Sequence, residues 1–121
     1  MQYIGIDIIE IDRVRRVIAR WGENFLRRVY TEPELKLYHK KLSSLAARFA
    51  GKEAVIKALG TQSNGISWKE IEILSDPDDK PLVQLYGKAK NQAGSLGLNN
   101  LAISLSHSKE YAVACVAGEA K

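Results

Sequence analysis

The sequence contains little cysteine and histidine, and this scarcity excludes several kinds of protein. Among its 121 residues Cys115 is the single cysteine, so no disulfide can form within the chain. Together with His39 and His107 it provides too few soft ligands for a zinc site. Because Cys115 lies in the apolar run YAVACVAG, we interpret it as a small buried hydrophobic residue.

Long apolar segments are also absent. No apolar run approaches the ~20 residues that a membrane-spanning helix requires. The first residues, MQYIGIDIIEID, lack the basic and then unbroken apolar regions of a secretory signal, so we expect a cytoplasmic protein without a membrane partner. With 45% hydrophobic and 26% charged residues, residues 1–121 are expected to form one domain. Such a domain is small for a complete active-site cleft, which makes a site shared between subunits an option.

The charge balance favours an anionic partner. The net charge is +4 and the pI is near 9.2, which suits nucleic acid, a phosphorylated metabolite or an acidic protein, and charge alone does not distinguish them. Helical spacing places Arg13, Arg16 and Arg20 in a basic stripe on a helix that begins at Asp12 as its N-cap and ends at Gly22. By itself the stripe indicates a solvated surface or an RNA-binding face.

Periodicity predicts a single α+β domain in which a long central helix and shorter helices pack on an antiparallel sheet. Strands are expected at about 4–9, 68–74, 82–86, 101–106 and 111–116, and helices at about 12–21, 25–29, 32–39, 44–59 and 88–93. Thr31 and Glu34 form a capping-box pattern with Pro33 in the first turn. Ser43 or Ser44 is the expected cap of the central helix.

The central helix carries charges that its apolar composition does not explain. The segment RFAGKEAVIKALG is apolar or small nearly all the way round, which is typical of a helix buried on most sides. Its charges form two pairs spaced i, i+4: Arg48 with Lys52, and Glu53 with Lys57. Ion pairs on the helix surface, or solvated charged patches, are one explanation. A cleft or interface that binds something ionic is the other, because a desolvated charge costs more than such pairs contribute.

Asp7 adds a carboxylate to the apolar strand 4–9. One face of this strand carries Ile4, Ile6 and Ile8, and the other carries Gly5, Asp7 and Ile9. Asp7 is either a guard of an edge strand or a functional group. If the strand packs on the central helix, with Gly5 clearing space, Asp7 and Glu53 converge as oxygen ligands beside Lys57. That arrangement suits Mg²⁺ and a diphosphate.

Hydroxyl groups and a histidine mark the end of the strand 101–106. Ser104 and Ser106 alternate with apolar residues, and His107 follows where the strand ends. A single histidine in this position is structural, exposed or functional, and it has no evident partner for a catalytic triad.

Four segments together resemble the phosphopantetheinyl transferase family, in particular the small bacterial holo-acyl-carrier-protein synthases. They are GID (5–7), RFAGKEAVIKALGT (48–61), WKEIEI (68–73) and SLSHSKEYA (104–112). They occur in the family's order and span nearly the whole chain, and the central run followed by SHS is highly specific. The resemblance implies transfer of 4′-phosphopantetheine from coenzyme A to a serine of apo-acyl carrier protein in fatty acid biosynthesis, with release of adenosine 3′,5′-bisphosphate.

The family's functional residues carry over position by position. Asp7 and Glu53 fall at its Mg²⁺ ligands, and Glu53, Lys57 and His107 are the implied catalytic residues. Contacts to coenzyme A are implied for Lys40, Arg48, Lys57, Gly60, Ser106 and His107, with Lys57 and His107 at the diphosphate and Arg48 and Lys40 at the nucleotide end. The base that takes the serine proton is left open between Glu53, His107 and a water, with a water held by Glu53 or the metal preferred.

The resemblance also implies partners. An acidic apo-acyl carrier protein would dock on Arg13, Arg16 and Arg20. Family members of this length are trimers with active sites between subunits. The apolar strand 111–117 is expected at the seam, because an exposed apolar edge strand would aggregate. One departure is Gln62, followed by Ser63 and Asn64 before Gly65, where the family usually has another glycine; it affects the expected grip on coenzyme A.

Two other functions fit the same residues. A basic RNA-binding domain would use Arg13, Arg16, Arg20, Arg27 and Arg28, but aromatic-rich strands for base stacking are missing. A Mg²⁺-dependent phosphohydrolase would use the same carboxylates with water as the nucleophile. Replacing Glu53 by Gln would disable either enzyme and spare RNA binding, so this variant separates the classes. The family resemblance itself implies no nucleic-acid partner.

Overall fold

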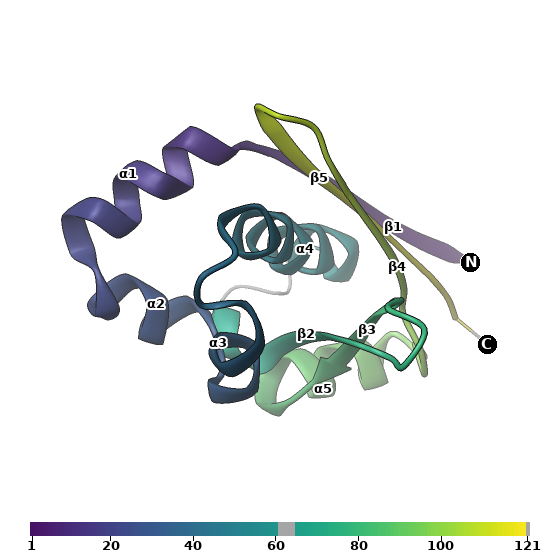
Figure 1. Ribbon diagram of the computed structural model, residues 1–121. Helices are drawn as coiled ribbons and strands as arrows, with labels where there is room; N and C mark the ends of the chain where they lie inside the picture. Colours follow the sequence, from purple (N-terminus) through teal and green to yellow (C-terminus); the bar gives the residue numbers. More distant parts are fainter. Residues whose placement is uncertain (61–64, 121) are drawn as a thin grey trace.

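The computed structural model describes residues 1–60 and 65–120, and it confirms the α+β class (Figure 1). The elements in chain order are β1 (Gln2–Glu10), α1 (Ile11–Trp21), α2 (Glu23–Val29), α3 (Glu32–Tyr38), α4 (Leu42–Leu59), the 3-10 helix η2 (Trp68–Glu70), β2 (Ile71–Ser75), β3 (Pro81–Leu85), α5 (Gly87–Ser95), β4 (Ala102–His107) and β5 (Tyr111–Glu119). The strands form two antiparallel sheets in place of the single sheet expected. One has the order β1-β5-β4, and the other is the hairpin β2-β3.

Helix α4 occupies the centre of the molecule, between the two sheets (Figure 1). Its buried residues pack on β4 and β5 on one side and on β2 and α5 on the other. Gly5 allows β1 to lie directly on this helix, because a Cβ atom at position 5 would overlap the carbonyl oxygen of Ala54. The predicted packing of the first strand on the central helix is therefore confirmed.

The helix caps follow the sequence signals in part. Thr31 and Glu34 form the predicted capping box at the start of α3. The predictions for the other two caps are wrong. Helix α1 begins at Ile11, so Asp12 lies inside its first turn, where it pairs with Arg15. Helix α4 begins at Leu42, because the carbonyl of Lys41 already accepts the first helical hydrogen bond, from the amide of Leu45, before either serine can cap it.

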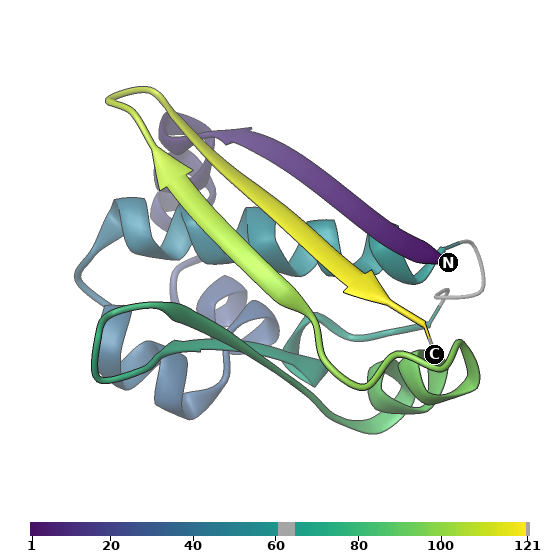
Figure 2. The same ribbon diagram turned by 90° about the vertical axis from the view of Figure 1, so that its right-hand side faces the viewer.

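The alternation of β1 is confirmed, but its isoleucine face is the outer one. Ile4, Ile6 and Ile8 are each about 60% exposed, at 62%, 59% and 62%. None of the elements formed by residues 1–60 and 65–120 covers this side of the sheet, which faces the viewer in Figure 2. Strand β5 is paired with β1 and β4, so the prediction that it is an edge strand is wrong. Cys115 belongs to the outer face and is exposed, which corrects the expectation that it is buried.

The segment before β2 is a helical turn and not strand. The side chain of Ser67 accepts a hydrogen bond from the amide of Lys69 and Glu70 reaches back to the amide of Ser67, which closes the 3-10 turn and delays the strand to Ile71. The departure at Gln62, Ser63 and Asn64 lies outside the described residues. Among the residues that are described, no helix is long and apolar enough to cross a membrane.

Candidate active site

Asp7 and Lys57 form an ion pair between β1 and α4. Asp7 lies on the face of β1 that carries Gly5, so it is held against the helix, and its side chain is 19% exposed. Nζ of Lys57 donates to Oδ1 of Asp7 at 3.0 Å and to the backbone carbonyl of Ile6 at 3.1 Å. A cation and a carboxylate are thus fixed at one point of the surface.

Glu53 is held from outside the helix. Its Oε1 accepts a hydrogen bond from the indole nitrogen of Trp68 at 2.9 Å. Glu53 and Lys57 therefore each take a partner from another element, and the explanation of these charges as an ion pair along the helix surface is wrong. Sequence reasoning treated Trp68 only as a strand residue, because nothing in a local pattern indicates which carboxylate an indole will reach.

Asp7 and Glu53 line one cavity of about 390 Å³, as the convergence of strand and helix predicted. Its other walls include Arg13, Phe25 and Phe49. Within residues 1–60 and 65–120 no group of three or more His, Cys, Asp or Glu residues could enclose a metal ion. Two carboxylates fit Mg²⁺, which keeps several waters and completes its shell with phosphate oxygens. The donor set of the cavity therefore suits a magnesium ion shared with a phosphorylated ligand.

Arg48, predicted at the nucleotide end, is engaged inside the chain. Its Nε donates to the carbonyl of Ile73 at 3.0 Å and Nη2 to Oγ of Ser75 at 3.1 Å. The guanidinium lies over the ring of Tyr38, 3.6 Å from its centroid. Lys40 is exposed two residues beyond Tyr38. Arg48 and Lys40 thus belong to a region around Tyr38 and the end of β2, and contact with a nucleotide stays a prediction.

His107 and Ser106 lie at the end of β4 and are exposed. His107 and Ile9 both pair with Ala112 of the strand between them. Two strand spacings separate β4 from β1, a distance of about 10 Å. One chain therefore does not bring His107 beside Asp7. Gly60, also predicted to contact coenzyme A, is the exposed C-cap of α4, with φ 86°.

The arginines of α1 are on its solvent side. Arg13, Arg16 and Arg20 are exposed, while Val14 is buried against the core. Nε of Arg16 also lies 3.4 Å from Oδ2 of Asp12, so this carboxylate neutralises part of the arginine's charge. Arg13 lines the same cavity as Asp7 and Glu53. The basic stripe thus begins at the edge of the candidate active site.

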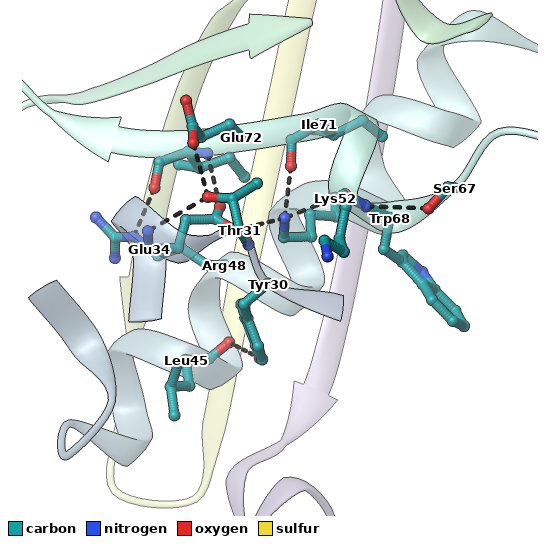
Figure 3. A network of polar contacts seen from close by, with 12 residues as sticks. Tyr30, Thr31, Glu34, Leu45, Arg48, Lys52, Ser67, Trp68, Ile71 and Glu72 are labelled. Atoms are coloured by element: carbon teal, nitrogen blue, oxygen red, sulfur yellow. Dashed lines mark hydrogen bonds and ion pairs between the residues drawn. The ribbon is translucent and has the colours of Figure 1, made fainter. Parts of the chain in front are cut away.

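A buried polar network joins α3, α4 and β2, and sequence reasoning missed it (Figure 3). Nζ of Lys52 is 2.7 Å from Oε1 of Glu34, and both side chains are fully buried. Oε2 of Glu34 accepts a hydrogen bond from the backbone amide of Ile73 at 2.8 Å. Burial lowers the pKa of Lys52, an effect that the Glu34 carboxylate opposes. Lys52 is therefore structural, whereas the sequence grouped it with Arg48 as one of two charged pairs on the helix.

Comparisons with known proteins agree with this arrangement. The family model described as the 4′-phosphopantetheinyl transferase superfamily matches residues 3–116. A holo-[acyl-carrier-protein] synthase of Dehalococcoides mccartyi strain CBDB1 is 52% identical, over 98% of this chain and 99% of its own length. The synthase of Herpetosiphon aurantiacus is 45% identical, over 98% of each chain.

A solved structure shows the same fold. The crystal structure of the Helicobacter pylori holo-[acyl-carrier-protein] synthase in complex with coenzyme A matches with a TM-score of 0.84 and 35% identity. The match covers 96% of this chain and 99% of that one. By its sequence and its fold, the chain belongs to the holo-[acyl-carrier-protein] synthases of the 4′-phosphopantetheinyl transferase superfamily.

Proposed function

We propose that this chain transfers 4′-phosphopantetheine from coenzyme A to a serine hydroxyl of apo-acyl carrier protein, in the cytoplasm, as a step that supplies fatty acid biosynthesis. The observation that carries the proposal is the cavity in which Asp7, paired with Lys57, and Glu53 face one space. The serine oxygen forms a bond to the β-phosphorus of coenzyme A, the bridging P–O bond breaks, and adenosine 3′,5′-bisphosphate leaves with the bond electrons.

Asp7 and Glu53 would hold Mg²⁺ in this cavity. When bound, the ion neutralises the charge that develops on the diphosphate oxygens. Lys57 is placed to act on the same charge, because its ammonium is fixed 3.0 Å from Asp7 and the side chain is 57% exposed to an incoming phosphate. Glu53, or a water that it holds, accepts the serine proton.

The trimer is part of the proposal. The outer face of the three-stranded sheet carries Ile4, Ile6, Ile8, Val113, Cys115, Ala117 and Ala102 in adjacent register positions. Ser104 and Ser106 of β4 lie on the same face, so its apolar part is centred on β1 and β5. An exposed apolar patch of this kind marks a protein interface. Packing three such faces together would cover the isoleucines and bring the His107 end of one subunit toward the cavity of another. The sheet face, and not an edge of β5, is thus the proposed contact.

The carrier protein would approach from α1. Arg13, Arg16 and Arg20 give an exposed basic surface that reaches the cavity at Arg13, so an acidic carrier would be guided to present its serine there. Coenzyme A would extend from the diphosphate site toward Arg48 and Lys40, along Gly60, Ser106 and His107 of the same or a neighbouring subunit.

Mass spectrometry of the intact carrier protein tests the transfer. An acidic apo-acyl carrier protein is incubated with the chain, coenzyme A and Mg²⁺, and the expected result is a mass gain of one phosphopantetheine group. EDTA and Glu53→Gln should each abolish the gain, and the glutamine keeps an acceptor for Trp68. No gain with several carrier proteins and a folded chain would contradict the proposal.

Two further measurements distinguish the other candidate functions. Hydrolysis of coenzyme A without modification of the carrier would indicate a phosphohydrolase. Binding of RNA that weakens steeply with salt and survives Glu53→Gln would indicate an RNA-binding domain. Light scattering tests the trimer: Ile6→Lys should give a monomer, and Leu37→Lys, at a leucine of α3 that is also more than half exposed, should not.

A further inference from the structure

We propose that Trp68 is a positioning residue for Glu53: its indole N–H holds Oε1 of the carboxylate and leaves Oε2 for the metal. The inference rests on the proposed function, because it assigns Glu53 to the magnesium ion. The contact that carries it is the 2.9 Å hydrogen bond from Nε1 of Trp68. Trp68 acts through Glu53 and touches no substrate in this scheme.

A glutamate on a helix needs such a partner to serve as a rigid ligand. Its last torsion is broad, so an unrestrained carboxylate samples many orientations. Glu53 lines two cavities, the one shared with Asp7 and a second of about 350 Å³ beside Arg28 and Ser67. Trp68 lines the second of these cavities, so its hydrogen bond holds Oε1 on that side and leaves Oε2 for the cavity shared with Asp7. Hydrogen bonds to ligating carboxylates commonly tune metal sites in this way.

The ring of Trp68 is itself held in place. It packs on Phe49 of α4, with centroids 5.9 Å apart, and Phe49 packs on Phe25 at 6.1 Å. The side chain is half-buried, so part of the indole packs on protein and part is exposed to solvent. These contacts restrict the ring orientation that aims N–H at Glu53.

The backbone of Trp68 is anchored by the buried network (Figure 3). Nζ of Lys52 donates to the carbonyl of Trp68 at 3.1 Å, and Lys52 is fixed by the fully buried Glu34. The reciprocal bonds between Ser67 and Glu70 close the turn on which Trp68 lies. Two adjacent residues of α4 therefore bind the same tryptophan. Lys52 donates a hydrogen bond to its backbone carbonyl, and Glu53 accepts one from its indole nitrogen.

Two variants that remove the N–H test the inference. Trp68→Phe keeps an aromatic ring against Phe49 but has no donor. In a Trp21→Phe background Trp68 is the one tryptophan of the chain. Its replacement by 3-benzothienylalanine keeps the ring shape and puts sulfur where the N–H was. The matched parent is Trp21→Phe with Trp68 intact, and melting temperatures check folding.

The first readout is Mn²⁺ binding in the presence of coenzyme A, measured from the free-ion signal in electron paramagnetic resonance. We expect the Kd for Mn²⁺ to rise about 10- to 100-fold in both variants. The second readout is the Mg²⁺ concentration for half-maximal transfer, which should rise in parallel, so that the loss of rate shrinks as Mg²⁺ increases. A merely structural role would not move the Mg²⁺ dependence.

The outcomes separate this inference from the proposed function. Unchanged Mn²⁺ binding in the folded benzothienylalanine protein would overturn the role of Trp68, even if transfer is demonstrated. Mn²⁺ binding that weakens in the variants of a protein without transfer activity would support the role of Trp68 and contradict the proposed reaction. A parent protein that transfers phosphopantetheine but does not bind Mn²⁺ would overturn the role of Trp68 and leave the proposed reaction standing.

Discussion

Nζ of Lys57 lies 3.0 Å from Oδ1 of Asp7, although the two residues are 50 positions apart in the sequence. The contact exists because Gly5 lets β1 lie on α4, which brings the strand carboxylate beside Lys57 near the C-terminal end of the helix. In the proposed reaction this pair supplies one cation and one carboxylate to the same diphosphate.

Lys57→Met should lower the rate of transfer by about 100-fold or more, because it removes a fixed cation from the place where negative charge develops. Lys57→Arg keeps the charge and should retain part of the rate. The measurement is the initial rate of carrier modification by mass spectrometry at saturating Mg²⁺. A wild-type rate in Lys57→Met would exclude a catalytic role for this lysine.

Lys52→Met should destabilise the protein by about 3 kcal/mol, because the carboxylate of Glu34 would stay buried without its cation. The double variant with Glu34→Gln should recover part of this loss. Arg27→Met, which removes an exposed pair with Glu23, is the matched control and should change stability by less than about 1 kcal/mol. Urea unfolding at constant protein concentration measures all three. Equal effects at the buried and exposed pairs would contradict this account.

The parts of the site that depend on local pattern could be predicted from the sequence. The period of two in β1 put Gly5 and Asp7 on one face, and the small residue predicted close packing on the helix. The partner of each charged side chain could not be predicted. A helical projection places Lys52 and Lys57 in different charged pairs, but it does not show that Lys52 is enclosed by α3 and β2 while Lys57 reaches β1.

Cys115 illustrates the same limit on the sheet. Its apolar neighbours suggested burial, but its register pairs it with Ile6 on the outer face. An apolar strand has the same sequence pattern whether both of its faces are buried within one chain or one face is left for contact with a second subunit. Long-range register decides between these cases, and local patterns do not contain it.

Gly5→Ala should reduce stability by about 3 kcal/mol, because the new methyl group would overlap the carbonyl of Ala54 and push β1 from α4. Transfer should fall as well, since Asp7 would move with the strand. Gly94→Ala is the control: it lies in α5 with open space around a Cβ, so it should be neutral or slightly stabilising. Thermal unfolding and the transfer assay give the comparison. A neutral Gly5→Ala would show that the strand tolerates displacement.

Alkaline pH should destabilise the protein partly through Tyr30. Burial raises the pKa of Tyr30 far above its ordinary value of 10.0, and its hydroxyl donates to the carbonyl of Leu45 at 2.6 Å. Above pH 10 the unfolded chain releases this proton and the folded chain keeps it, so stability falls as pH rises. Tyr30→Phe should therefore show a shallower decline in unfolding free energy between pH 9 and 11. An identical decline would assign the effect to other groups.

Mixed trimers should test whether one site uses two subunits. In one chain the two strand spacings between β1 and β4 keep His107 from Asp7, so a site that needs His107 beside the diphosphate must take it from a neighbour. Glu53→Gln and His107→Ala should each be inactive alone. Co-expressed and purified as mixed trimers, they should recover transfer, because some interfaces then combine an intact Glu53 with an intact His107. Wild-type activity of His107→Ala alone would remove His107 from the reaction. Inactive mixed trimers would place both residues in the site of a single subunit, where β4 would have to move toward the cavity on binding coenzyme A.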